Sequence, residues 1–324
     1  MKVGEVLNWK KTLLFVVLIC GSITALMHLL NRLFHFISVK DDLLRDEDSH
    51  FYQWRFGSIH YTKRGQGKPL LLIHDLNTSS SGHEWHAIEG QLAKTNTVYT
   101  LDLLGCGRSD KPSLTYTSFL YVQLIADFIK NIIGEPVSIV ATGASGAFTV
   151  EACKNNPTQL DKILLVNPKP LFTLAKMPCK KDKVLRTLFC SPILGTFLYN
   201  LIVNQGSITR KFRTVYYSTS SKVNPMDIRF YLEASQKNKT RGKFLFACII
   251  TKLTNSNLLH SLTGLNNSVF IIAGQDVPRS SNTLKEYQSL LPSIEAVEIK
   301  KCGFLPQLEC PEKVLEHINL FFDL

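Results

Sequence analysis

The segment Pro136–Ala147 (PVSIVATGASGA) constrains the fold of this 324-residue chain more than any other stretch. Its first half is a short apolar run rich in β-branched residues, and its second half is a cluster of small residues, after which a helical pattern begins. Small residues let a strand reverse sharply into a helix without Cβ clashes. The segment therefore predicts a tight strand–turn–helix connection of the kind that lifts one side chain above a parallel sheet.

Strand-like and helix-like patterns alternate on both sides of this segment. Two strands with a turn at Gly57 are expected over Phe51–Thr62. Further strands are expected at Pro69–His74, Thr97–Leu101, Pro136–Ala141, Lys162–Val166, Val269–Ala273 and Ala296–Ile299. Helices are expected at Glu84–Ala93, Tyr121–Ile133, Ser145–Asn155 and Pro311–Phe322. This alternation predicts an α/β fold with a mostly parallel central sheet and helices on both faces.

The alternation stops between Pro170 and about Leu265, where helical patterns follow one another without a strand. We interpret this segment as a helical lid inserted into the core. The predicted divisions are an N-terminal tail (1–11), a transmembrane anchor (12–33), a linker (34–50), a first core part (51–169), the lid (170–265) and a second core part (266–324). A chain of this length can bury a sizeable core.

The apolar segment Thr12–Leu30 holds 19 residues without a formal charge. This length fits a bilayer core, so we expect a single-pass anchor in the cell membrane, with a cleaved signal peptide as the alternative. Lys10 and Lys11 before the segment, against Arg32 after it, favour an extracytoplasmic globular domain. The cysteines argue for the other side, because the seven that lie outside the anchor have no metal-type spacing and are expected to be free thiols.

The net charge of +11 is concentrated in the predicted lid. Between Pro170 and Asn255 there are 15 lysines and arginines against 3 acidic residues, and aromatic residues are interleaved with them. This pattern favours contact with membrane lipids, or with a small amphiphilic or ester ligand that has an anionic head. A solvated lid with ordinary core aromatics is the alternative. No nucleic-acid partner is expected, because no recognition motif accompanies the charge.

Five stretches, in chain order, resemble motifs of the α/β-hydrolase superfamily, and the resemblance covers roughly Phe51–Leu324. They are Leu71–His74, Asp102–Pro112 (DLLGCGRSDKP), the turn within Pro136–Ala147, Leu165–Pro168 and Gly303–Glu312. The Asp-x-x-Gly-x-Gly-x-Ser-Asp-Lys-Pro pattern is specific in this setting. The resemblance implies a Ser, Asp or Cys nucleophile at the apex of the turn, an acid after a late strand and a histidine near the end. No cofactor is expected.

Two registers of the turn fit the family pattern for the nucleophile. One places Ser145 at the apex, and the other places Gly143 there. In relatives, a helix-ending proline follows the apex by about fourteen residues. Pro157 lies 14 residues after Gly143 and 12 after Ser145, which favours Gly143. A glycine cannot be a nucleophile.

The other two triad positions also depart from the family pattern. Gly303-Phe304-Leu305-Pro306 resembles Gly-His-x-Pro, so Phe304 stands where relatives have the histidine, and an aromatic ring cannot relay a proton. Gly274-Gln275-Asp276-Val277 resembles Gly-x-x-Asp, so the position of the acid is Val277. Asp276 lies one residue earlier and remains a candidate for the acid.

The expected oxyanion region carries an acidic residue. His74-Asp75 stands where relatives have His-Gly, and Ala144 follows the favoured apex. A carboxylate at position 75 would oppose a developing negative charge unless it is protonated or rotated away. The alternative is that Asp75 is a turn or capping residue. His74 is either a structural histidine at the end of a strand or a catalytic base.

Two functions remain open from the sequence. The first is a hydrolase that acts on a carboxylic ester or a related lipid-borne bond with a rearranged set, for example Ser145, His74 and Asp276. The second is a catalytically inactive, membrane-tethered module that binds a ligand or serves as a scaffold. Loss of the serine and histidine of a triad typically removes a factor of about 10⁶ in turnover.

No metal site is expected from the sequence. His83 and His86 are three residues apart, but no further His, Asp or Glu completes a recognisable ligand pattern with them. In the rearranged set, either histidine could replace His74, and Asp75 could replace Asp276.

Overall fold

The computed structural model describes residues 3–323 and confirms the predicted α/β architecture. Eight strands form one sheet in the order β1-β2-β4-β3-β5-β6-β7-β8. They are β1 (Ser49–Trp54), β2 (Gly57–Arg64), β3 (Lys68–Ile73), β4 (Asn96–Leu101), β5 (Val137–Thr142), β6 (Leu160–Val166), β7 (Val269–Gly274) and β8 (Glu295–Ile299). Strand β2 pairs antiparallel with β1 and β4, and the remaining neighbours pair in parallel.

Helices cover both faces of the sheet because successive residues of a strand point to opposite sides. Leu71 packs into the core on the face of α3 and α4, whereas Leu70 and Leu72 pack into the core on the face of α2 and α14. The helices that flank the sheet are α2 (His86–Leu92), α3 (Ser118–Phe128), α4 (Ser145–Asn155), α12 (Ser280–Leu290) and α14 (Pro311–Phe322). Short helical segments η1 (Gly82–Trp85), η2 (Ile129–Ile133) and α13 (Pro306–Glu309) join them.

The lid lies between β6 and β7, and among the described residues it contains helices and loops but no strand, as the sequence predicts. Its helices are α5 (Leu171–Leu174), α6 (Lys180–Cys190), α7 (Ile193–Ile202), α8 (Gln205–Lys211), α9 (Pro225–Thr240), α10 (Lys243–Ile250) and α11 (Leu259–Thr263). Two short turns, η3 (Phe212–Tyr216) and η4 (Ser220–Lys222), connect α8 to α9. Aromatic side chains from η3 and α9 form a separate core beneath the lid.

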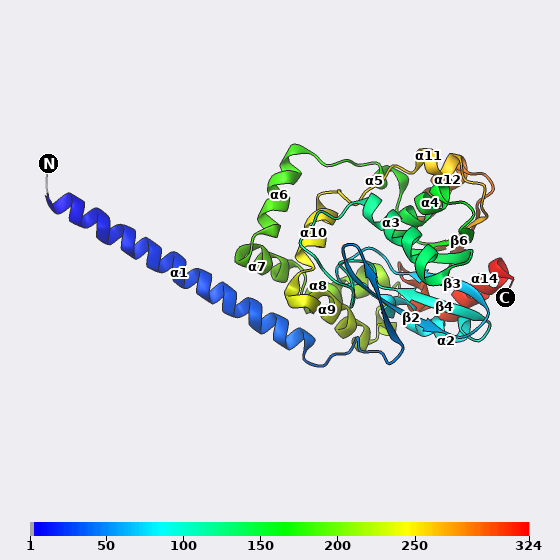
Figure 1. Ribbon diagram of the computed structural model, residues 1–324, viewed down its shortest axis with the longest axis horizontal. Coiled ribbons are helices and arrows are strands. Elements are labelled where there is room, and N and C mark those ends of the chain that lie inside the picture. The colour runs from blue at the N-terminus through cyan, green and yellow to red at the C-terminus, as the bar shows by residue number, and fades with distance from the viewer. Residues whose placement is uncertain (1–2, 324) are drawn as a thin grey trace.

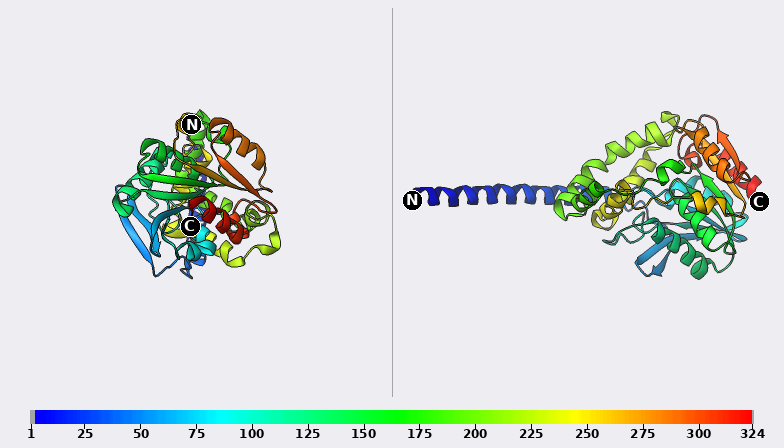
Figure 2. Two further views of the ribbon diagram at one scale, coloured as in Figure 1. Left: turned by 90° about the vertical axis from the view of Figure 1, so that its right-hand side faces the viewer. Right: turned by 90° about the horizontal axis from the view of Figure 1, so that it is seen from above.

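Helix α1 (Val3–Val39) projects as one long rod from the lid side of the globular part (Figures 1 and 2). Its stretch Trp9–Val39 is long and apolar enough to cross a membrane, which suits either an anchor or an N-terminal signal sequence. The helix continues to Val39, so the first residues of the predicted linker (34–50) belong to α1.

The last third of α1 packs on the lid through a chain of amide side chains. Asn31, which is buried, donates to the carbonyl oxygen of Ile193 at 3.1 Å and accepts from the Asn200 amide at 3.0 Å. The Gln236 amide in turn donates to Asn200 at 3.1 Å. Buried polar groups are stable only when they are hydrogen-bonded, and these three bonds join α1 to the lid helices α7 and α9. The C-terminal third of α1 therefore packs as part of the lid.

Candidate functional site

The turn after β5 places its sharpest residue at Gly143. This glycine has φ +60° and lies between the end of β5 and the start of α4, and its N–H donates to the carbonyl oxygen of Val166 at 2.9 Å. A left-handed conformation at this point suits glycine, since a Cβ atom adds strain there. Ser145, the other candidate for the apex, is the first residue of α4 and is fully buried.

The Asp75 carboxylate fills the space above Gly143. Its Oδ1 accepts a hydrogen bond from the backbone N–H of Ala144 at 2.8 Å, and the Asp75 side chain is buried. A Cβ atom built on Gly143 would lie 2.2 Å from this same oxygen and 3.0 Å from Cζ of Phe304. The backbone donor that follows the apex is therefore already occupied, and Asp75 and Gly143 depend on each other sterically.

The predicted rearranged set of Ser145, His74 and Asp276 is not brought together. The Ser145 hydroxyl donates to the backbone carbonyl of His74 at 2.6 Å. The His74 ring is committed elsewhere: its Nδ1 pairs with the carbonyl oxygen of Asp75 at 2.7 Å, and its Nε2 accepts from the Leu103 N–H at 3.0 Å. Burial lowers the pKa of His74. The structure thus places His74 as the structural histidine at the end of a strand.

The candidates for the acid and the histidine, in the loops after β7 and β8, lie in different surroundings. Asp276 is exposed and accepts a hydrogen bond from the Ser218 hydroxyl of the lid. Val277 and Phe304 instead line one small cavity of about 70 Å³ beside the turn. This volume is far below the roughly 300–1,000 Å³ of typical small-molecule sites. The Phe304 ring also stacks on Tyr216 of the lid, with centroids 6.0 Å apart.

A second buried acid lies behind Asp75. Glu84 is fully buried, and its carboxylate accepts from the Asp75 N–H at 3.0 Å and from the Tyr231 hydroxyl at 3.1 Å. Burial, together with the nearby Asp75 carboxylate, raises the pKa of Glu84 to about 8. Burial and the neighbouring carboxylate therefore favour the protonated form of Glu84 beside the turn.

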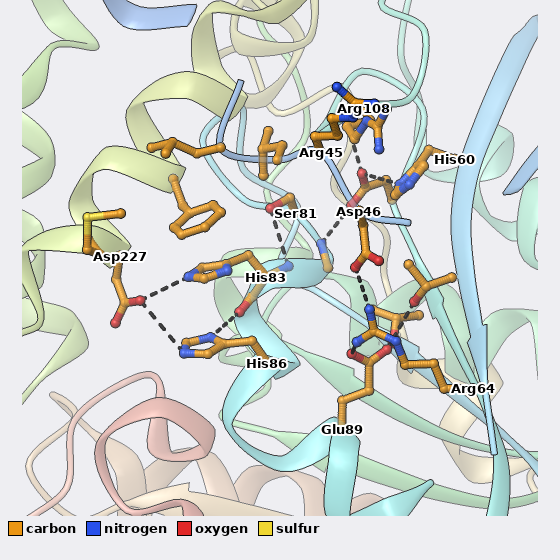
Figure 3. Close-up of a pocket in the computed structure, with 18 of the residues that line it drawn as sticks. Arg45, Asp46, His60, Arg64, Ser81, His83, His86, Glu89, Arg108 and Asp227 are labelled. Carbon is orange, nitrogen blue, oxygen red and sulfur yellow. Dashed lines mark hydrogen bonds and ion pairs between the residues drawn. The ribbon is translucent and has the colours of Figure 1, made fainter. Parts of the chain in front are cut away.

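A polar cleft of about 470 Å³ lies over β2 and β4, bounded by α2, α9 and the segment after α1 (Figure 3). Arg64 forms ion pairs there with Asp46 at 2.5 Å and with Glu89 at 2.6 Å. Arg45 and Arg108 also line the cleft. The cleft opens to the surface, and its lining combines charged side chains with apolar ones such as Leu43, Met226 and Phe230.

His60 beneath this cleft contacts a serine and an acid. Its Nδ1 lies 2.9 Å from Asp102 Oδ2, and its Nε2 lies 3.1 Å from Ser49 Oγ, an order that resembles a nucleophile–base–acid chain. The Ser49 hydroxyl, however, donates to the carbonyl oxygen of Asp46 at 2.7 Å, and the neighbouring Arg108 N–H donates to Asp102. These contacts hold the strand ends and the loop together.

One residue that the sequence analysis missed lies at the other end of the cleft. Asp227, in the first turn of α9, has its Oδ1 2.9 Å from His83 Nε2 and 3.9 Å from His86 Nε2 (Figure 3). The expectation that no third residue joins this histidine pair is wrong. In the sequence, Asn224 and Pro225 indicate the start of a helix, so Asp227 is recognisable only as an acidic residue in its first turn. No sequence pattern links Asp227 to His83, which lies 144 residues earlier.

A third hollow, of about 730 Å³, lies between α1 and the lid. Its lining combines apolar and basic side chains, among them Phe36, Ile193, Arg32 and Lys239. It lies where α1 meets the globular part, next to the amide chain that joins α1 to α7.

The fold and the sharp turn after β5 together define an α/β-hydrolase-fold protein. A family model described as "Alpha/beta hydrolase family" matches residues 70–317, so this chain belongs to that family. The solved serine hydrolase involved in carbazole degradation superposes with a TM-score of 0.69 at 18% identity, covering 85% of this chain and 98% of that one. A likeness at this identity shows the shared fold.

Two bacterial relatives illustrate the range of similarity. An uncharacterized protein of Mycobacterium tuberculosis is 29% identical over 136 residues, which is 38% of this chain and 39% of that protein. The chain thus matches well under two thirds of the length of that relative. The cis-3-alkyl-4-alkyloxetan-2-one decarboxylase of Shewanella oneidensis is 22% identical over 300 residues, covering 86% of this chain and 90% of that protein.

Proposed function

We propose that this chain is a membrane-tethered binding member of the α/β-hydrolase family that does not hydrolyse esters at the turn after β5. The observation that carries the proposal is the contact of the Asp75 carboxylate with the Ala144 N–H directly above Gly143. A hydrolase needs a nucleophile at the apex and a free backbone donor for the oxyanion. Here the apex has no side chain, and the donor already binds a carboxylate.

The remaining triad positions support the same reading. Val277 and Phe304 can neither orient a base nor take a proton, and they close a cavity too small for an ester of ordinary size. Ser145 is the serine at the turn, and its proton is held by the His74 carbonyl. Its activation would require a base that contacts Oγ, and His74 has no free nitrogen.

The ligand that fits best is an amphiphile with an anionic head, bound in the hollow between α1 and the lid. Arg32 and Lys239 supply positive charge to that hollow, while Phe36 and Ile193 supply apolar surface. The hollow is also large enough for such a ligand, in contrast to the cavity beside the turn.

The proposal includes a retained anchor with the lid facing the membrane surface. Cleavage of α1 after Asn31 would remove this side chain and its hydrogen bonds to Asn200 and to the Ile193 carbonyl, each of which contributes about 0.5–1.5 kcal/mol. The exposed apolar residues Val184, Leu188 and Leu194 on α6 and α7 suit an interfacial position beside the basic residues of the lid. We place the globular part outside the cytoplasm on the flanking charges of α1.

A fluorophosphonate probe tests the absence of an activated serine. We expect no adduct on any serine of the folded full chain in detergent, and no turnover of short-chain esters above the background rate. The physical reason is that Ser145 has no base in contact with its hydroxyl. The measurement is peptide mapping by mass spectrometry, with the Ser145→Ala variant and a known active serine hydrolase treated in parallel.

An adduct on Ser145 that disappears in Ser145→Ala, together with ester turnover, would show that the chain is a rearranged hydrolase and would overturn the proposal. An adduct that forms only after unfolding would count as non-specific and leave the proposal standing. The positive control guards against a probe that has lost its reactivity.

The lid helix α6 is expected to contact anionic lipid. In nanodiscs, the amide hydrogens of Lys180–Cys190 should exchange on the order of 100-fold more slowly with phosphatidylglycerol than with phosphatidylcholine, because each lysine near an anionic surface contributes about 1 kcal/mol. Charge reversal of Lys180, Lys181 and Lys183 should abolish the difference. The measurement is hydrogen exchange on the full chain.

The matched control for this experiment reverses three exposed lysines on the far side of the core, Lys285, Lys300 and Lys313. This variant changes the net charge by the same amount, and its α6 amides should still respond to lipid charge. Equal exchange in the two lipids for the unmodified chain would remove the membrane role of α6.

A further inference from the structure

Three metal-type donors from two distant segments converge at the rim of the polar cleft. His83 belongs to η1 and His86 begins α2, both on the core, whereas Asp227 comes from the lid helix α9. One donor atom from each lies within 4.8 Å of the others (Figure 3). We propose that His83 Nε2, His86 Nε2 and Asp227 Oδ1 bind one divalent transition-metal ion of the zinc class.

Both histidines direct Nε2 toward the acid, and a bound metal ion would replace the proton that His83 Nε2 donates to Asp227. The Nδ1 of His86 lies 2.8 Å from the carbonyl oxygen of His83, so Nδ1 carries the proton and Nε2 keeps its lone pair. Metal-binding histidines commonly donate their second nitrogen to a backbone carbonyl in this way. The His83 ring is held flat between His86 and Phe230, with centroids 4.1 and 3.7 Å away.

The acid is buried and lacks a fixed cation. The Asp227 side chain is 4% exposed, and among the described residues only histidine nitrogens lie within ion-pair distance of its carboxylate. Its second oxygen, Oδ2, lies 3.5 Å from the buried Tyr217 hydroxyl, which orients the carboxylate with Oδ1 toward the histidines. A buried carboxylate requires a compensating positive charge, and a bound metal ion would provide one.

The separations are close to those of a bound ion. Zinc–nitrogen and zinc–oxygen distances of about 2.1 Å in a tetrahedral arrangement put neighbouring donors about 3.4 Å apart. Oδ1 lies 2.9 Å from His83 Nε2 and 3.9 Å from His86 Nε2, so each of these two pairs needs to move by roughly half an ångström. The donor nitrogens of the two histidines lie within 4.8 Å of each other. The two rings are nearly parallel, and a tilt of His86, whose side chain is 42% exposed, would bring both lone pairs onto one point.

Two imidazoles and one carboxylate are a donor set for zinc or another first-row transition metal rather than for magnesium or calcium. Three protein ligands would leave a position for water or for an anion from the cleft, where Arg45 and Arg108 provide positive charge. Because the ligands join the core to α9, the ion would also fasten the lid. The inference does not depend on the chemistry at Gly143.

The test is zinc titration of the full chain in detergent after removal of metal with a chelator. We expect one zinc ion per chain by calorimetry, and an increase in the thermal midpoint on binding. Asp227→Asn keeps the shape of the side chain and His86→Ala removes an exposed ring, and each should weaken binding by about 100-fold or more. A cobalt-loaded sample should show ligand-field bands without a thiolate-to-cobalt band, which excludes the cysteines as ligands.

His260→Ala, an exposed histidine on α11, is the matched control and should bind zinc as the unmodified chain does. Absence of stoichiometric binding by the folded chain would overturn the inference. Zinc binding that is unchanged in both Asp227→Asn and His86→Ala would overturn it as well. Neither result bears on the serine-probe experiment, so the two proposals fail separately.

Discussion

Replacing Gly143 with serine is expected to destabilise the protein by roughly 3–5 kcal/mol, and not to create a hydrolase. A side chain in this left-handed conformation costs about 1–2 kcal/mol. The new Cβ would also lie 2.2 Å from Asp75 Oδ1, so the carboxylate would have to leave the Ala144 N–H. Loss of a hydrogen bond to a charged group costs about a further 1.5–3 kcal/mol. Denaturant unfolding of the full chain in detergent measures the change.

Gly134 provides a matched control for this substitution. It has φ +78°, and a Cβ atom built on it would have no neighbour within 4 Å. Gly134→Ser should therefore cost only the backbone strain, about 1–2 kcal/mol. If Gly143→Ser costs no more than Gly134→Ser, then a side chain at position 143 does not clash with the Asp75 carboxylate, and the steric argument is wrong.

A double-mutant cycle isolates the contact between the two residues. Asp75→Gly alone leaves the Ala144 N–H without its acceptor, but in the Gly143→Ser background it also removes the clash. The double variant should therefore be less destabilised than the sum of the single variants by at least about 1 kcal/mol, which is typical of residues in contact. If the destabilisations of the two single variants simply add up to that of the double variant, the proposed contact of Asp75 with a side chain at position 143 is contradicted.

The fold could be read from the sequence because its determinants are local. The small residues of Pro136–Ala147 predict the reversal after β5, and the predicted helix Ser145–Asn155 has the bounds of α4. The apolar run Pro69–His74 predicts a strand buried on both faces, and β3 is buried in this way from Leu70 to Ile73. Helix α3 begins at Ser118, three residues before the expected start at Tyr121, because Thr117 caps it by accepting from the Leu120 N–H.

The candidate sites could be read only in part, because their geometry depends on distant contacts. The sequence placed Asp75 near the turn, but its direction depends on the N–H of Ala144, 69 residues later. The sequence left His74 as a possible catalytic base, because no nearby residue pattern reveals that both ring nitrogens are hydrogen-bonded to backbone groups of Asp75 and Leu103. Asp227 meets His83 only because the lid folds back over the core.

The lysine of the Asp102–Pro112 motif is expected to make stability rise with pH above neutrality. Lys111 is 2% exposed, and its ammonium group donates to the carbonyl oxygens of Gly107 at 2.9 Å and Gly105 at 3.4 Å. No carboxylate lies within ion-pair distance of it in the part of the chain that the structure describes. Burial lowers the pKa of Lys111 from 10.5 to about 8.

The direction of the effect follows from which state holds more protons. Between pH 8 and about 10.5 the unfolded chain keeps the Lys111 proton while the folded chain has released it, so the free energy of unfolding increases with pH. The contribution amounts to about 2 kcal/mol between pH 8 and 10, at 1.36 kcal/mol per pH unit when the two states differ by a whole proton. Below about pH 7 both states are protonated, and the contribution is flat.

Lys111→Met isolates this contribution, because methionine fills a similar volume and does not titrate. The difference in unfolding free energy between the unmodified chain and Lys111→Met should grow in favour of the unmodified chain by about 2 kcal/mol from pH 8 to pH 10. Tyrosines and cysteines that titrate in the same range affect both proteins and cancel in the difference. Lys313→Met, at an exposed lysine on α14, should show no such growth. A constant difference for Lys111→Met would mean that the buried ammonium group stays charged through folding, with its two carbonyl partners supplying the solvation that water gives it in the unfolded chain.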